Sequence, residues 1–334
     1  MFFAPLSLGF AAPTGPLAAS GLCDIAAAAG NPCVAAHSTV RAMYSSYSGA
    51  LYQVQRSDNS TMDVKVLTQG GYVDAKAQDT FCGASACVIS SIYDQSPMGN
   101  HLAIAPPGGA HEKRDAPVNA TADPLTIGGH RAYSAYFEGG MGYRRDRTSG
   151  IAKGDEAETV YMVTAGQHYN DRCCFDYGNA ETNDLDDGAG TMEAVYFGNA
   201  NGGLNHGGAG KGPWIMADME NALWGADKVQ SNEPSIQHEF VTAMIKGDAG
   251  EAPGHWAIKG GDAQAGGLTV LWDGPRAPHY APMKKQGAII LGIGGDNSDG
   301  AVGTFYEGAM LRGYTTDGTD DAMQANIVAA GYGK

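Results

Sequence analysis

The chain has 334 residues, of which 43% are hydrophobic, only 17% are charged and 49 are glycine. Its 36 acidic and 21 basic residues give a net charge of −15 at pH 7, which argues against nucleic acid and anionic membranes as partners, because both bind basic surfaces. No run of 18 apolar residues occurs, so the sequence predicts no transmembrane helix.

The first segment in chain order, residues 1–20, is apolar and rich in alanine and proline. It ends in Leu17-Ala18-Ala19-Ser20, a small-residue stretch that suits a signal peptidase, although no basic residues precede it. We interpret residues 1–20 as a possible signal peptide or disordered segment. Residues 21–334 are then expected to form one domain.

Two helices are predicted, one near each end of the chain. Residues 34–47 place Val40 and Met43 at helical spacing. Residues 320–330 follow Thr319, which would serve as an N-cap, and begin with acidic residues that suit a first turn.

Short β-type runs separated by Gly, Asn, Asp and Pro occupy the middle of the chain. They do not alternate regularly with helices, which disfavours a parallel α/β sheet and favours an antiparallel sandwich or barrel. The predicted strands are residues 88–93, 159–164, 192–197, 214–218, 240–246, 256–259, 268–272, 288–291 and 304–312.

Six cysteines form three close pairs in the sequence, and none has the Cys-x-x-Cys spacing of a structural zinc site. Local disulfides are the simplest account and would place the protein in an oxidising, extracellular compartment. Sequons for N-glycosylation at Asn59 and Asn119 fit a secreted glycoprotein. For the adjacent pair, two free buried thiols are the alternative. The expected disulfides are Cys23–Cys33, Cys82–Cys87 and Cys173–Cys174.

Two segments carry acids in contexts that suit glycoside hydrolysis, which needs a pair of carboxyl groups. The apolar run 214–218 leads to Asp218 and Glu220, which would share one face of an extended strand. The run 288–291 enters a glycine-rich turn that presents Asp296. An edge strand with a solvated face and a simple Asp-Asn turn are the alternatives.

These segments together resemble glycoside hydrolase family 54, the α-L-arabinofuranosidases. The resemblance extends from about Cys23 to Tyr332 and is most specific at the adjacent cysteines. The segments that carry it are residues 32–39, 78–82, 92–96, 173–181, 214–221, 292–298 and 304–308.

The resemblance implies an all-β fold, a concanavalin-type antiparallel β-sandwich of jelly-roll type with a few short helices. It implies that Glu220 is the nucleophile and Asp296 the general acid/base. It also implies that a Cys173–Cys174 disulfide forms an apolar platform under the sugar, and that no metal or cofactor is required. The polar substrate-binding groups would be Asp218, Asn221 and the backbone of Gly295.

The implied function is a retaining exo-glycosidase, a monomer secreted to remove terminal non-reducing α-L-arabinofuranosyl residues from arabinoxylan or arabinan. Three departures from the family pattern bear on it. An arabinose-binding β-trefoil module is absent from this sequence, which predicts weaker polymer binding. The loop 198–212 lacks the family's Trp, and Ala222 replaces an Asn. Galactofuranose or D-arabinofuranose therefore stays open as the substrate sugar, and a non-catalytic, lectin-like sandwich is the alternative outside enzymes.

Overall fold

The computed structural model describes residues 20–200, 207–228, 233–249 and 254–334. Apart from Ser20, the predicted signal segment lies outside these residues. The helices are α1 (Leu22–Ala28), α2 (Ala75–Cys82) and α3 (Asp317–Ala329). The first strands are β1 (Cys33–Ser38), β2 (Ala50–Arg56), β3 (Thr61–Lys65), β4 (Cys87–Ile92), β5 (Leu102–Ile104), β6 (Pro124–Ile127), β7 (His130–Tyr133), β8 (Ala135–Phe137) and β9 (Tyr143–Arg145). They are followed by β10 (Glu158–Ala165), β11 (Asp176–Ala180), β12 (Glu193–Gly198), β13 (Trp214–Asp218), β14 (Leu223–Trp224), β15 (Phe240–Asp248), β16 (His255–Asp262), β17 (Thr269–Pro275), β18 (Ala288–Leu291) and β19 (Gly303–Arg312).

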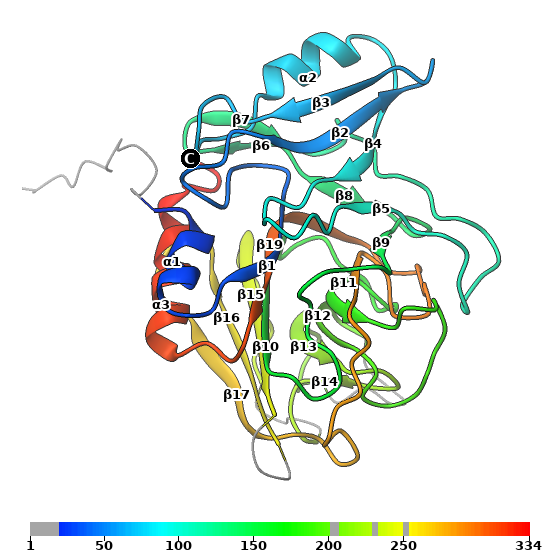
Figure 1. The fold of residues 1–334 in the computed structure, drawn as a ribbon, viewed down its shortest axis with the longest axis vertical. Coiled ribbons are helices and arrows are strands. Elements are labelled where there is room, and N and C mark those ends of the chain that lie inside the picture. The colour runs from blue at the N-terminus through cyan, green and yellow to red at the C-terminus, as the bar shows by residue number, and fades with distance from the viewer. Residues whose placement is uncertain (1–19, 201–206, 229–232, 250–253) are drawn as a thin grey trace, which may run out of the picture.

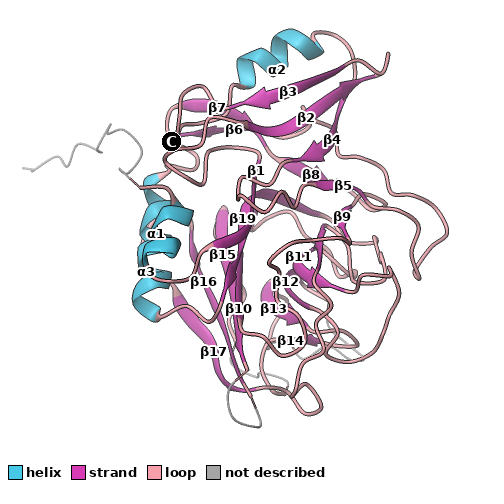
Figure 2. Cartoon of the chain, viewed as in Figure 1, coloured by secondary structure: helices cyan, strands magenta, loops and turns pink. Residues whose placement is uncertain are grey.

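Two large antiparallel sheets make up most of the fold (Figure 1). One has the strand order β1-β19-β10-β15-β16-β17, with β8 added at β19. The other has the order β14-β13-β12-β11-β18-β9-β5-β4-β2-β3. Strands dominate the chain, and the α1 and α3 helices pack together at one side (Figure 2).

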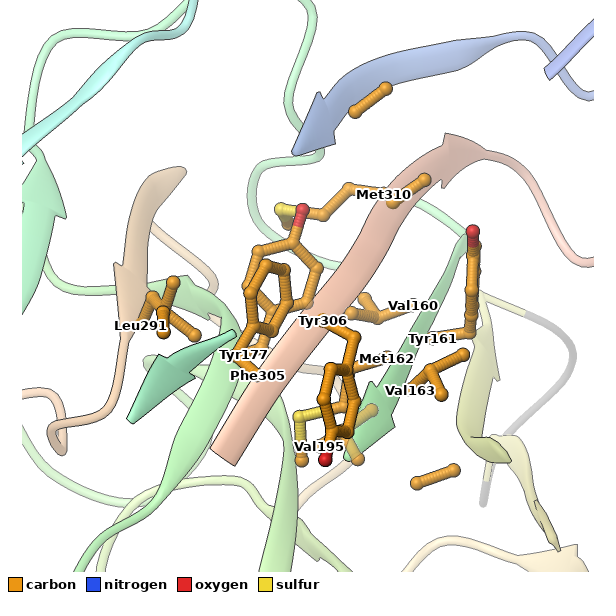
Figure 3. Packing of buried hydrophobic residues seen from close by; sticks show 14 of the residues in the cluster. Val160, Tyr161, Met162, Val163, Tyr177, Val195, Leu291, Phe305, Tyr306 and Met310 are labelled. Atoms are coloured by element: carbon orange, nitrogen blue, oxygen red, sulfur yellow. The ribbon is translucent and has the colours of Figure 1, made fainter. Parts of the chain in front are cut away.

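The core lies where the two sheets face each other, because β10 and β15 of one sheet contact β12 and β13 of the other. Figure 3 shows side chains from both sheets meeting in this layer. Tyr177 of β11 and Phe305 of β19 are buried with their ring centroids 5.3 Å apart. Face-to-face packing of antiparallel sheets is the arrangement of a β-sandwich, so the predicted fold class is confirmed.

The helix predicted at residues 34–47 is wrong. Residues Cys33–Ser38 form β1, which pairs with β19, and every one of them is buried. A strand that is buried on both faces shows no polar alternation, so its apolar run cannot be told from a helix by periodicity. The strand ends where Oγ of Ser38 accepts hydrogen bonds from the backbone N–H groups of Val40 and Arg41.

The C-terminal helix is confirmed, but it begins three residues earlier than predicted. Its N-cap is Thr316, whose side chain accepts a hydrogen bond from the backbone N–H of Thr319. Buried Lys246 and Lys259 each bond Asp320 in the first turn, which stabilises the earlier start. Short α1 and α2 were not predicted.

All nine predicted strands occur; β13 and β18 have the predicted bounds, and each of the others has at least one end shifted by one to three residues. Among the described residues, none of the helices has the length and apolar character that crossing a bilayer requires.

Candidate active site

A cavity of about 270 Å³ opens where β13 and β18 end. It collects every predicted catalytic and substrate-binding residue except Cys174, which is buried beside it. The two predicted catalytic acids, Glu220 and Asp296, therefore face one space although 76 positions separate them in the sequence. The lining residues are Asp171, Cys173, Ala200, Asp218, Glu220, Asn221, Ala222, Leu223, Gly294, Gly295, Asp296 and Ser298.

Glu220 is presented by a turn that breaks the strand. β13 ends at Asp218, and Glu220 and Asn221 have positive φ values of 72° and 64°. Oδ1 of Asp218 accepts a hydrogen bond from the backbone N–H of Glu220 at 3.0 Å, as in an Asx turn. The expectation that Asp218 and Glu220 share a face of an extended strand is therefore wrong. The turn nevertheless directs both acids into the cavity.

Asp296 lies in the glycine-rich turn after β18, as predicted. Its Oδ1 accepts hydrogen bonds from the backbone N–H of Ser298 at 3.0 Å and from the Ser298 hydroxyl at 2.5 Å. Because both bonds fall on one carboxyl oxygen, they fix the carboxyl rotation. The next residue, Asn297, is fully buried at φ 66° and donates from Nδ2 to the carbonyl of Pro106.

The three predicted disulfides are present, and the Cys173–Cys174 bridge lies at the cavity wall. Cys173 is exposed while Cys174 is fully buried against apolar side chains that include Tyr196 and Trp214. The backbone N–H of Cys174 also donates to the carbonyl of Ser298 at 3.3 Å, which ties the bridge to the Asp296 turn. The disulfide therefore supplies an apolar surface next to the acids.

Arg144 of β9 connects the turn that carries Asp296 with the end of β11. Its buried Nη1 donates to the carbonyl of Gly295 at 2.6 Å and to Oδ1 of Asn297 at 2.9 Å, on either side of Asp296. Its Nη2 donates to the backbone carbonyl of Glu181, at the end of β11. The planar guanidinium thus holds the Asp296 turn against the neighbouring strand.

Four carboxyl groups cluster at and below the cavity: Asp176, Glu181, Asp218 and Glu220. Burial, followed by the Asp218 carboxylate, raises the pKa of Asp176 well above its ordinary value. Burial is also the main cause that raises the pKa of Asp218 to about 7. Burial and the carboxylates of Asp218 and Glu181 raise the pKa of Glu220. Closely spaced buried carboxyl groups cannot all ionise, so the cluster retains protons near neutral pH.

In the part of the chain that the structure describes, two groups of side chains have the spacing of metal ligands. Cys173, Cys174 and Asp218 form one, but its sulfur atoms are joined in a disulfide and are not thiolates. The second is His111 with Asp115 and Asp299. Nδ1 of His111 accepts from the backbone N–H of Lys113, so Nε2 carries the proton and faces Asp299 at 2.8 Å. The contact is therefore that of a neutral imidazole N–H facing a carboxylate, and it is not an ion pair.

Sequence reasoning assigned no role to Asp176, Glu181 or Arg144. Asp176 belongs to β11, Glu181 directly follows β11, and Arg144 belongs to β9. Only the strand order β11-β18-β9 brings them beside the Asp296 turn. The altered loop 198–212 contributes Ala200 to the cavity wall, while its residues 201–206 lie outside the described residues.

Comparisons with known proteins converge on one family. The family model described as "Alpha-L-arabinofuranosidase B, catalytic" matches residues 22–333. Alpha-L-arabinofuranosidase B of Aspergillus kawachii is 53% identical over 98% of this chain and 65% of its own length. Alpha-L-arabinofuranosidase B of Aspergillus niger shows the same identity and the same coverage.

Solved structures give the same picture. A crystal structure of an arabinofuranosidase complexed with arabinofuranosyl-α-1,2-xylobiose superposes with a TM-score of 0.89 at 53% identity, over 93% of this chain and 65% of that one. A GH54 α-L-arabinofuranosidase soaked with a cyclic sulfate inhibitor gives a TM-score of 0.88 at 53% identity, over 93% of this chain and 66% of that one. The chain thus spans about two thirds of the length of these relatives.

Proposed function

The chain belongs to the catalytic-domain family of α-L-arabinofuranosidase B, and from this premise we propose that it is a retaining exo-glycosidase that releases terminal α-L-arabinofuranosyl residues from arabinoxylan and arabinan. The observation that carries the proposal is the meeting of Glu220 and Asp296 in one cavity beside the Cys173–Cys174 disulfide. A pair of carboxyl groups is what glycoside hydrolysis requires.

The size of the cavity supports cleavage of a single terminal sugar. Its volume of about 270 Å³ lies just below the roughly 300–1,000 Å³ typical of pockets for drug-sized ligands. A space of this size suits one sugar ring better than a polymer segment. The exposed sulfur of Cys173 would pack against the apolar face of the ring, while Asp218, Asn221 and the backbone of Gly295 would bind its hydroxyl groups.

The proposed reaction has two displacements. Ionised Glu220 attacks the anomeric carbon and forms a glycosyl ester, while protonated Asp296 transfers its proton to the departing glycosidic oxygen. Asp296, now ionised, removes a proton from water, whose oxygen attacks the anomeric carbon and releases Glu220 as a carboxylate. The bonds from Ser298 hold the Asp296 carboxyl in one orientation through both steps.

A second furanose is favoured by one observation. Within the described residues, the loop 198–212 contributes Ala200, a small side chain, to the cavity wall, and the sequence of the loop contains no Trp, Tyr or Phe. Without an aromatic side chain from this loop, the protein makes fewer contacts with the outer edge of the sugar. Galactofuranose or D-arabinofuranose is therefore the alternative substrate. A lectin-like role would leave the convergence of both acids on the cavity without a purpose.

We also propose that the protein is a secreted monomer. Three disulfides join all six cysteines, which fits an oxidising extracellular compartment.

The test is hydrolysis of 4-nitrophenyl α-L-arabinofuranoside beside the β-D-galactofuranoside and α-D-arabinofuranoside. Wild type is compared with Glu220→Gln and with Glu138→Gln, a control at an exposed position outside the cavity. We expect activity on the first substrate that collapses only in Glu220→Gln. Activity confined to another furanoside would keep the mechanism and change the sugar. A folded wild type that cleaves none of them would contradict the proposal.

A further inference from the structure

Glu181 is a buried acid beneath the cavity that the proposed reaction does not use. It follows the last residue of β11, and its side chain is fully buried. The Thr191 hydroxyl contacts both Oε1 of Glu181 and the backbone carbonyl of Gly188. Oε2 receives no hydrogen bond from any donor group within the described residues. A buried carboxyl oxygen with no donor is costly unless it carries a proton or meets one.

The unpartnered oxygen faces the nucleophile. A Cβ built on Gly295 would overlap with Oε2 of Glu181 and would lie 2.9 Å from Oε2 of Glu220. Both oxygens therefore crowd the same point above Gly295. This crowding puts a proton carried by one of these carboxyl groups within reach of the other. A bond between two carboxyl oxygens exists only if one of them is protonated.

The surrounding charges require such a proton. Glu220 also faces the carboxylates of Asp218 and Asp186, and burial is the leading cause that raises the pKa of both Glu181 and Glu220. Arg144 is the cation beside Glu181, but it donates to the backbone carbonyl and not to the carboxyl group. Two neighbouring carboxyl groups in a buried site hold one proton between them, because two negative charges there would repel each other strongly.

Only one placement of that proton is compatible with attack, because a nucleophilic carboxylate must be ionised. We propose that Glu181 is a positioning residue whose protonated carboxyl donates an O–H···O bond to Glu220 and aims its other oxygen at the sugar. This inference rests on the proposed function. The proton stays on Glu181 through both displacements, so Glu181 forms and breaks no covalent bond with the substrate.

Glu181→Gln and Glu181→Leu separate the possibilities. Gln keeps a neutral donor of nearly the same shape, whereas Leu has a similar volume and no donor. We expect Glu181→Gln to keep kcat/KM within about tenfold of wild type. We expect Glu181→Leu to lose about 100-fold in kcat, as for a reacting group misplaced by about 1 Å. The acidic limb of the kcat/KM profile should move to higher pH only in Glu181→Leu, because Glu220 there loses the donor that favours its ionised form.

Thr191→Val covers the case in which Glu181→Leu does not fold. It leaves both carboxyl groups in place but removes the hydroxyl that anchors Glu181, and we expect a lower kcat with unchanged KM. Wild-type activity in a folded Glu181→Leu would overturn the inference, and so would equal losses of activity in Glu181→Gln and Glu181→Leu. If Glu181→Leu does not fold, wild-type activity in Thr191→Val would overturn it instead. Both results presuppose an active wild type, so they are distinct from failure of the proposed function.

Discussion

Replacing Gly295 by Ala tests how tightly the floor of the site is packed. The backbone of Gly295 is not in the left-handed region, so Ala adds a methyl group without backbone strain. That methyl group would overlap with Oε2 of Glu181 and lie 2.9 Å from Oε2 of Glu220. Because the carboxyl group of Glu181 is buried and contacts Thr191, we expect relief of the overlap to displace the nucleophile or the Asp296 turn as well.

A displacement of about 1 Å in a reacting group lowers the rate about 100-fold, which corresponds to about 2.7 kcal/mol of activation free energy. We therefore expect kcat/KM on 4-nitrophenyl α-L-arabinofuranoside to fall by about two orders of magnitude. Overpacking of the buried floor should also lower the free energy of unfolding by about 1–3 kcal/mol.

Gly109→Ala is the matched control. Gly109 faces the same turn, but its added Cβ would meet Cβ of Asp296 at 3.4 Å, an ordinary contact. We expect Gly109→Ala to keep activity within about twofold of wild type, because substitutions at exposed positions that cause no clash are nearly neutral. Undiminished activity in Gly295→Ala, with the protein folded, would refute the placement of Glu181 and Glu220 around Gly295.

Three further predictions concern other parts of the molecule. Burial raises the pKa of Glu233 from 4.5 to about 8, so between these two pH values the folded chain keeps a proton that the unfolded chain releases. The stability of wild type is therefore lost as the pH rises through this range. In urea titrations Glu233→Gln should be more stable than wild type by about 3 kcal/mol near pH 7 and equal to it near pH 4. Arg144→Lys loses the fork that flanks Asp296, so its activity should fall about tenfold more with poor than with good aryl leaving groups; a uniform loss in a leaving-group series would contradict this role. Replacement of both Cys173 and Cys174 by Ala removes the apolar wall and should raise KM more than it lowers kcat, whereas an unchanged KM would show that the bridge does not contact the sugar.

The sequence predicted the sandwich well because its strands are short apolar runs bounded by turn residues, such as the one that became β18. It failed at β1, where burial on both faces removed the alternation that marks a strand. The expected start of α3 was late because Thr316 and Thr319 are both plausible caps, and tertiary bonds from Lys246 and Lys259 favour the earlier one.

At the site, the sequence identified Glu220 and Asp296 but not the backbone that presents Glu220. A strand was expected at Glu220, and the Asp218 side chain instead caps a turn with positive φ. Glu181 and Arg144 could not be found from local patterns. Their positions depend on the pairing of Ile290 with Arg144 and of Gly178 with Ile290, which are contacts between distant segments.

The most direct test of the central claim is the stereochemistry of transfer to methanol, followed by proton NMR. Wild type and Glu220→Gln are incubated with 4-nitrophenyl α-L-arabinofuranoside in aqueous methanol, and the anomer of the methyl glycoside is identified before equilibrium. A double displacement at Glu220 predicts methyl α-L-arabinofuranoside from wild type and none above background from Glu220→Gln. The β-anomer, or an undiminished yield from Glu220→Gln, would contradict the account.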